Sequence, residues 1–321
     1  MNNNEDVKLL DDFVLKYQDF KDEISKVIVG QDKIIKQVLI SIFCNGHCLL
    51  VGVPGLAKTL LVQTISKTLG MSFNRIQFTP DLMPSDIVGS EILDEDRKFK
   101  FIKGPIFSNI ILADEINRTP PKTQAALLEA MQEKSVTNSG TTYNLENPFF
   151  VLATQNPIEQ EGTYPLPEAQ LDRFMFNVIL DYPSYDEELK IVKDTTSEFN
   201  KELNVIMSSE DIIRYQHLIR RIPVTDNVLE YIVDIVSKTR VGSDRMDEQT
   251  KRYIEWGAGP RASQFMLLAT KCHAAINGKY SPDIEDVKNI VKPILRHRIV
   301  KNYKAEADGV TIDNIIDNII S

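Results

Sequence analysis

In this chain of 321 residues, a glycine-containing turn joins a short apolar run to a helix-like segment, and this turn narrows the possible folds more than any other feature. The run His47–Val51 ends in C-L-L-V and is bounded by glycine, which is typical of a buried parallel strand. It leads into Gly52–Thr59, G-V-P-G-L-A-K-T, and helical spacing resumes over Thr59–Leu69. The turn approaches the P-loop consensus GxxxxGK[ST], in which backbone N–H groups and a helix N-terminus bind phosphates. We therefore predict a strand, a phosphate-binding loop and a helix in succession.

Three positions of this turn differ in chemical role. The Lys58 ammonium can reach the β- and γ-phosphates of a nucleotide, and the Thr59 hydroxyl can bind Mg²⁺. Ala57 stands where the consensus has its last glycine. Its methyl group is harmless if the backbone φ is negative and unfavourable if φ is positive. The alternative interpretation is a plain strand–turn–helix corner without a ligand.

Further apolar runs predict an α/β layered domain. Asn109–Ala113, Phe149–Ala153 and Phe174–Leu180 have the composition of buried strands, and helical segments such as Lys122–Gln132 separate them. Strands that alternate with helices form a mostly parallel sheet between helical layers. Ligands of such sheets collect at the carboxyl ends of the strands. The residues that follow these runs are therefore candidates for one site.

Two of these runs end in polar residues suited to phosphate chemistry. Asp114 and Glu115 follow the first, where the aspartate can hold the Mg²⁺ shell and the glutamate can act as general base toward water. Asn156 follows the second, in A-T-Q-N-P, and can orient the water or contact the γ-phosphate. The alternative interpretation of Asn156 is an ordinary Asn–Pro turn.

After Pro183 the pattern changes to amphipathic helices, and we expect no strand there. The predicted domains are 1–183, of αβα architecture, and 184–321, an all-helical domain in which Thr311 can cap the last helix. Arg173 in L-D-R-F and Arg261 in G-P-R-A-S could stabilise charge at a triphosphate. Taken alone, either arginine would be an ordinary surface residue.

Composition excludes several functions. The net charge of −9 disfavours a nucleic-acid-binding surface, and the short runs Asp94–Lys98 and Arg296–Arg298 are interpreted as solvated faces. The three cysteines form no CxxC pair, so we expect buried thiols and no zinc site or disulfide. The N-terminus lacks the pattern of a signal peptide, and no apolar stretch is long enough for a membrane span. We expect a cytoplasmic protein.

Taken together, the motifs resemble the MoxR family of AAA+ ATPases, within the helix-2-insert group. The resemblance covers the chain from about residue 15 to its end. The stretches that carry it are I-V-G-Q, G-V-P-G-L-A-K-T, G-P-I-F-S-N-I-I-L-A-D-E-I-N-R, A-T-Q-N-P, Y-P-L-P-E-A-Q-L-D-R-F, G-A-G-P-R-A-S and L-R-H-R-I. Ala57 is part of this family's version of the P-loop, so the departure from the general consensus favours this branch.

The resemblance implies a role for each matching position. Lys58 and Thr59 correspond to Walker A, Asp114 and Glu115 to Walker B, and Asn156 to sensor 1. Arg173 would be an arginine finger acting on ATP held by a neighbouring subunit, and Arg261 would be sensor 2 on the helical lid. Thr59 and Asp114 would hold Mg²⁺. The remaining contacts to ATP would come from Val29, Gly30, Gly52, Pro54, Gly55, Leu56, Ala57 and Leu60.

The resemblance also implies insertions and partners. Pro80–Phe101 would hold the helix-2 insert, and Val136–Asn147 would form a hairpin before sensor 1. Family members form rings, usually hexamers, and act like chaperones on partner complexes, often ones with a von Willebrand factor A domain. Arg118 would touch a neighbour's nucleotide or lie at a helix start, and Arg296–Arg298 would be structural or interfacial. The alternatives are a magnesium-chelatase-like motor subunit, a nucleic-acid translocase, and an ATP-gated scaffold with little turnover.

Overall fold

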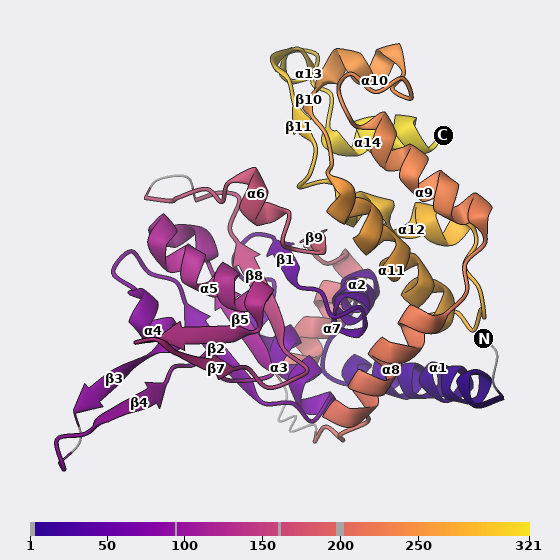
Figure 1. Cartoon of the computed structure of the whole chain (residues 1–321). Helices are drawn as coiled ribbons and strands as arrows, with labels where there is room; N and C mark the ends of the chain where they lie inside the picture. Colours follow the sequence, from indigo (N-terminus) through magenta and orange to yellow (C-terminus); the bar gives the residue numbers. More distant parts are fainter. Residues whose placement is uncertain (1–3, 94, 160–161, 197–201) are drawn as a thin grey trace. The chain divides into compact units, whose positions relative to one another are not determined.

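The computed structural model describes residues 4–93, 95–159, 162–196 and 202–321 (Figure 1). The chain divides into two compact units, and each is described by itself. The α/β unit comprises Lys16–Leu166 and Val178–Ile213. The helical unit comprises Met1–Leu15, Pro167–Asn177 and Arg214–Ser321. Two long helices, α1 (Asn4–Ser25) and α8 (Ser209–Arg221), each contribute residues to both units.

A five-stranded sheet with the order β2-β5-β8-β1-β9 forms the centre of the α/β unit. Its strands are β1 (Cys48–Val51), β2 (Phe73–Gln77), β5 (Ile110–Asp114), β8 (Phe150–Gln155) and β9 (Phe176–Ile179). The pairs β2–β5, β5–β8 and β1–β8 are parallel. Every residue of β5 is buried, as expected for a parallel strand with both faces covered. The predicted α/β class with a mostly parallel sheet is confirmed.

Helices of the α/β unit follow the strands and connect them. They are α2 (Asp32–Phe43), α3 (Lys58–Thr68), α5 (Pro121–Glu133) and α7 (Tyr185–Thr195), with the short helix η1 (Ile116–Arg118) after β5. The apolar residues predicted to define α2, including Val38, Leu39 and Ile42, are buried. Cys44, Cys48 and Cys272 are also buried and free, so the prediction of buried thiols is confirmed.

The α/β unit has two hairpins that are not part of the five-stranded sheet, and Figure 1 shows the first, β3–β4, projecting away from it. The first follows α4 (Pro84–Val88) and pairs β3 (Gly89–Leu93) with β4 (Phe99–Lys103). The second pairs β6 (Ser135–Asn138) with β7 (Thr141–Asn144) within the predicted hairpin Val136–Asn147, and Ser139–Gly140 forms its tip. The Phe101 ring stacks on the Tyr143 ring with centroids 4.2 Å apart, which ties the two hairpins together. Asp94, in the run interpreted as a solvated face, lies outside the described residues.

The helical unit consists mainly of helices, but it also has a small two-stranded ribbon, so the prediction of an all-helical domain without strands was wrong. Its helices are α6 (Glu168–Leu171), α9 (Asp226–Lys238), α10 (Glu248–Tyr253), α11 (Pro260–Ile276), α12 (Ile284–Leu295), α13 (Tyr303–Ala307) and α14 (Ile312–Ile320). The strands β10 (Ile254–Trp256) and β11 (Val300–Lys301) pair antiparallel. Strands of two and three residues are too short to show a period in the sequence.

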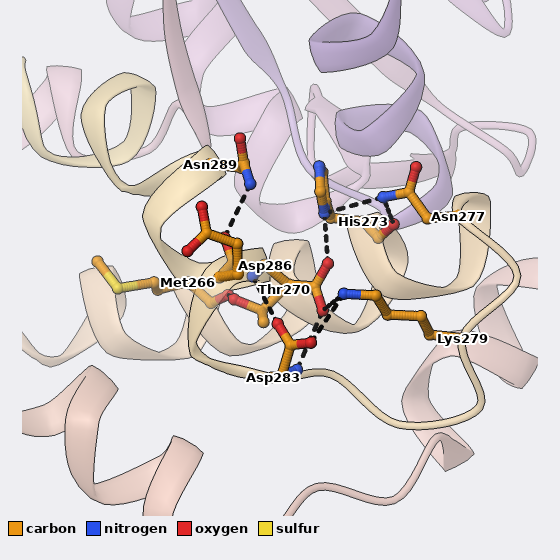
Figure 2. A network of polar contacts seen from close by, with 9 residues as sticks. Met266, Thr270, His273, Asn277, Lys279, Asp283, Asp286 and Asn289 are labelled. Carbon is orange, nitrogen blue, oxygen red and sulfur yellow. Dashed lines mark hydrogen bonds and ion pairs between the residues drawn. The ribbon is translucent and has the colours of Figure 1, made fainter.

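A buried polar network joins α11 to the start of α12 (Figure 2). The Asp286 carboxylate, whose side chain is 1% exposed, lies 2.8 Å from His273 Nδ1 and 3.1 Å from Lys279 Nζ. Lys279 also pairs with Asp283, the N-cap of α12, at 2.8 Å. Thr311 caps α14 through its hydroxyl, which accepts a hydrogen bond from the Asn314 N–H, as the sequence indicated.

Candidate active site

Three strand ends of the α/β unit meet at one edge of the sheet. β8 lies between β1 and β5, with Val51 beside Gln155 and Ala113 beside Ala153 in the parallel register. The segments that leave these strands are the P-loop after β1, Asp114–Glu115 at the end of β5, and Asn156 after β8. The structure therefore brings together the Walker A, Walker B and sensor 1 positions that the sequence predicted to share an edge.

The P-loop ends with Ala57 in a left-handed conformation, at φ 54° and ψ 28°. Of the two cases considered from the sequence, this is the unfavourable one, because a Cβ at positive φ costs roughly 1–2 kcal/mol. Gly55 also has a positive φ, of 88°, and a Cβ there would meet no neighbour, so the backbone conformation alone favours glycine. At Gly52, by contrast, a Cβ would lie 2.7 Å from the Leu180 side chain. Close packing therefore requires glycine at that position.

Lys58 opens helix α3 and points back over the loop. Its Nζ donates a hydrogen bond to the Gly52 carbonyl at 2.7 Å. Burial lowers the pKa of this ammonium, while the nearby carboxylates of Asp114, Glu115 and Glu159 act to raise it. A partly desolvated ammonium beside a helix N-terminus is a strong point charge for a phosphate.

Asp114 is buried and held through both of its carboxylate oxygens. The Thr154 hydroxyl donates to Oδ1 at 2.6 Å, and the Arg75 guanidinium donates to Oδ2 at 2.7 Å. Thr154 also accepts a hydrogen bond from the Glu115 N–H at 2.9 Å, so one hydroxyl orients both acidic residues. Neither Arg75 nor Thr154 was identified from the sequence as a site residue. Only the strand pairing brings them to this carboxylate.

Glu115 stands in a left-handed conformation at φ 59° and ψ 49°. A non-glycine residue in this region costs of order 1–3 kcal/mol, and such strain clusters at functional sites. Its Oε2 accepts from Gln77 Nε2 at 2.8 Å and pairs with Arg118 at 2.9 Å. Arg118 is thus a partner of the predicted general base within the same chain, a contact that the sequence motifs do not indicate.

Asn156 is buried at the end of β8, and its side-chain oxygen accepts a hydrogen bond from the Ile158 N–H at 3.2 Å. This contact stabilises the turn, as the alternative interpretation expected, and it fixes the side chain at the sheet edge. Near Val29, the adjacent Gly30 has φ 68° and the Gln31 amide donates to the Leu56 carbonyl of the P-loop at 3.4 Å. The segment of Val29 and Gly30, predicted to contact ATP, is therefore tied to the P-loop through Gln31.

Arg173 and Arg261 belong to the helical unit and are described within it. The Arg261 guanidinium pairs with Asp172 at 3.0 Å, and Arg298 pairs with the other oxygen of the same carboxylate at 2.7 Å. Arg298 and His297 are buried, so the interpretation of Arg296–Arg298 as a solvated face was wrong. Charged side chains enter a protein interior when ion pairs and hydrogen bonds compensate their desolvation, as they do here.

The predicted Mg²⁺ ligands suit that ion chemically. Thr59 and Asp114 offer a hydroxyl and a carboxylate, and Mg²⁺ prefers such oxygen ligands together with water and substrate phosphates. Among the described residues, no group of three or more His, Cys, Asp or Glu side chains could hold a metal ion. Within the same described ranges, no helix is long and apolar enough to cross a bilayer.

A P-loop, an acidic pair and a polar sensor at one edge of a parallel sheet, together with a helical unit, define an AAA+ ATPase. The AAA family model (ATPase family associated with various cellular activities) matches residues 47–176, and the AAA lid domain model matches residues 246–319. A crystal structure from Cytophaga hutchinsonii, provisionally described as an ATPase, superposes with a TM-score of 0.92 at 45% identity. That match covers 98% of this chain and 96% of the other.

Sequence relatives identify the branch. Chaperone MoxR1 of Mycobacterium tuberculosis is 42% identical over 301 residues, which cover 93% of this chain and 79% of the relative. The uncharacterized protein YeaC of Bacillus subtilis is 41% identical, covering 94% and 92% of the two chains. Protein MoxR of Paracoccus denitrificans is 27% identical and covers 90% of each. The chain belongs to the MoxR family of AAA+ ATPases.

Proposed function

We propose that this protein is a Mg²⁺-dependent ATPase that works as a ring of subunits, a hexamer, in the cytoplasm. Hydrolysis drives chaperone-like remodelling of a partner protein complex, and a von Willebrand factor A domain protein is the expected client. The proposed functional domains are residues 1–183 for nucleotide binding and residues 184–321 for the lid, and these bounds differ from those of the two compact units. The name of the mycobacterial relative, a chaperone, supports the remodelling part of the proposal.

The proposed chemistry assigns each residue of the sheet edge a role. Glu115 takes a proton from the water that attacks the γ-phosphorus, and the bond from that phosphorus to the bridging oxygen breaks to release ADP. Lys58 offsets negative charge on the β- and γ-phosphates, and Asn156 orients the water. Thr59 and Asp114 hold Mg²⁺, which neutralises charge on the phosphate oxygens when bound. Arg261 and a neighbouring subunit's Arg173 stabilise the charge that develops on the γ-phosphoryl group.

The conformation of Glu115 is the observation that best supports this function. Glu115 follows a fully buried strand and has a left-handed backbone conformation. Its N–H donates to Thr154, and its carboxylate contacts Gln77 and Arg118, at the sheet edge that also carries the P-loop. A surface acidic turn needs no such restraint. The arrangement favours a base that is fixed in place before substrate binds.

Glu115→Gln is the direct test. We expect phosphate release to fall by about 100-fold or more, because a general base contributes that much, while ATP binding stays within about threefold. Glu133→Gln, an exposed change on α5, is the matched control and should keep wild-type turnover. Equal turnover in the two variants would contradict the proposed role of Glu115.

The same variant separates the alternative functions. An ATP-gated scaffold would release little phosphate in the wild type, and Glu115→Gln would change nothing. A nucleic-acid translocase would show turnover that rises with added DNA or RNA and falls with salt. The net charge of −9 argues against that outcome. A magnesium-chelatase-like motor would depend on a chelatase partner, whereas a pull-down with Glu115→Gln should retain the client of a remodelling ATPase.

A further inference from the structure

Within the helical unit, buried side chains of the L-R-H-R stretch bind the backbone that carries Arg173. The Arg298 side chain is 1% exposed, which is unusual for an arginine. Its NH2 donates to the Asp172 carbonyl at 3.0 Å and to the Phe174 carbonyl at 2.7 Å, and its NH1 donates to the Met175 carbonyl at 3.3 Å. One guanidinium thus holds carbonyls on both sides of Arg173.

His297 adds a second bond to the same segment. Its Nε2 lies 2.9 Å from the Phe174 carbonyl oxygen, so this nitrogen carries the proton. Burial, and the positive charge of Arg298, hold the pKa of this imidazole well below its usual value. The ring is therefore a neutral donor at physiological pH, and it shares the Phe174 carbonyl with Arg298.

The Asp172 carboxylate completes the arrangement. Arg298 Nε donates to Oδ1 at 2.7 Å, and Arg261 NH1 donates to Oδ2 at 3.0 Å. One carboxylate next to Arg173 therefore contacts both the buried Arg298 and the predicted sensor 2. Arg261 is the more exposed of these two arginines, since 42% of its side chain is accessible.

We propose that Arg298, assisted by His297, is a positioning residue for Arg173 and fixes the finger for action on the neighbouring subunit's ATP. This inference rests on the proposed function. A guanidinium presents its donors in a rigid fork, so it can fix several carbonyls at once where an ammonium cannot. A finger must meet the developing phosphoryl charge at hydrogen-bond distance, and a displacement of about 1 Å can cost about 100-fold in rate.

Arg298→Lys keeps the charge and removes the fork. We expect its kcat to fall by about 10- to 100-fold while the KM for ATP changes less than about threefold, because the finger acts in the transition state. Arg296→Lys is the matched control from the same stretch. Arg296 forms a bidentate pair with Asp313 of α14, away from the finger segment in sequence, so the kcat of Arg296→Lys should stay within about twofold.

Oligomers assembled from two different variants can distinguish a misplaced arginine finger from a general structural defect of the Arg298→Lys subunit. Arg298→Lys subunits have an intact P-loop, whereas Lys58→Ala subunits have an intact finger and no usable P-loop. Mixing the two should restore phosphate release above the sum of the separate samples, as should mixing Arg173→Ala with Lys58→Ala. A general structural defect in Arg298→Lys would not be rescued by a partner.

The two mixtures with Lys58→Ala subunits have three possible outcomes. Recovery in both mixtures supports the positioning role. Recovery with Arg173→Ala but not with Arg298→Lys overturns it and leaves the trans finger intact. Recovery in neither mixture overturns both the trans finger and this inference.

If thermal melting shows that Arg298→Lys does not fold, the variants His297→Leu and His297→Gln are used in its place. The leucine variant should lose kcat, and the glutamine variant, which keeps a donor for the Phe174 carbonyl, should retain it.

Discussion

Ala57 has a backbone conformation that glycine would adopt at lower cost. Its φ of 54° places the methyl group in the left-handed region, and the residue is exposed, so no packing compensates. We expect Ala57→Gly to raise the free energy of unfolding of the α/β unit by up to about 1 kcal/mol. Ala125→Gly, at an exposed helical position of α5, should lower it by about 1 kcal/mol. Urea titrations should therefore show changes of opposite sign in the free energy of unfolding for the two variants. Changes of the same sign would contradict a left-handed backbone at Ala57.

His47 makes the stability of the α/β unit depend on pH. The ring is buried, with Nε2 3.1 Å from the Met131 carbonyl and Nδ1 accepting from the Val151 N–H at 3.0 Å. Burial lowers its pKa from the usual 6.5 to about 4. Because the folded pKa lies below the unfolded one, this stability is fully present above pH 6.5 and is lost as the pH falls toward 4.

We expect the His47 contribution to the free energy of unfolding to be roughly 3 kcal/mol across that range. His47→Gln should unfold with a weaker dependence on pH between 6.5 and 4 than the wild type. His217→Gln, which removes an exposed histidine, is the control. Parallel pH profiles for wild type and His47→Gln would show that the ring is not the titrating group.

At the scale of elements, the Asp286 carboxylate fixes the connection between α11 and α12 (Figure 2). Removing a buried charge leaves its partners unsatisfied, which costs more than losing an exposed pair. We expect Asp286→Asn to lower the free energy of unfolding of the helical unit by about 2 kcal/mol or more. Asp283→Asn is the matched control, since Asp283 is half exposed and asparagine also caps helices. This variant should lower the free energy of unfolding by less than about 1 kcal/mol. A similar loss in both variants in urea titrations would contradict the role of burial.

The elements differ in how well the sequence predicted them, and burial explains the difference. β1, β5, β8 and β9 were predicted to within about two residues, because buried parallel strands are continuous apolar runs. β2, F-N-R-I-Q, was not predicted, since it is an edge strand with exposed and polar positions. Its side chains Arg75 and Gln77 contact Asp114 and Glu115, so missing the strand meant missing part of the site.

In the candidate site, too, the sequence predicted only those residues that a local pattern marks. Residue types with a fixed place in a motif, such as Lys58 and Glu115, were found from spacing alone. Thr154 and Arg298 act through contacts made by pairing and packing, which no local pattern contains. The L-R-H-R stretch was named as structural or interfacial, and its burial agrees with the structural part of that interpretation.

At the scale of the whole molecule, the proposed catalytic residues divide between the two units. Lys58, Asp114 and Glu115 belong to the α/β unit, whereas Arg173 and Arg261 belong to the helical unit. The P-loop that constrained the fold therefore provides only part of the proposed site, and a neighbouring subunit's Arg173 provides another part. An ATPase of this kind should be slow as a monomer, because an arginine finger is worth about 10³- to 10⁵-fold in turnover.

The shared active site can be tested by measuring phosphate release per subunit over a range of protein concentrations with Mg²⁺ and saturating ATP. We expect turnover per subunit to rise with concentration and to reach a plateau where sedimentation shows the assembled oligomer. Arg173→Ala should stay at the low monomer rate throughout. A turnover per subunit that is constant from monomer to oligomer, or one that is absent at every concentration, would contradict the shared active site.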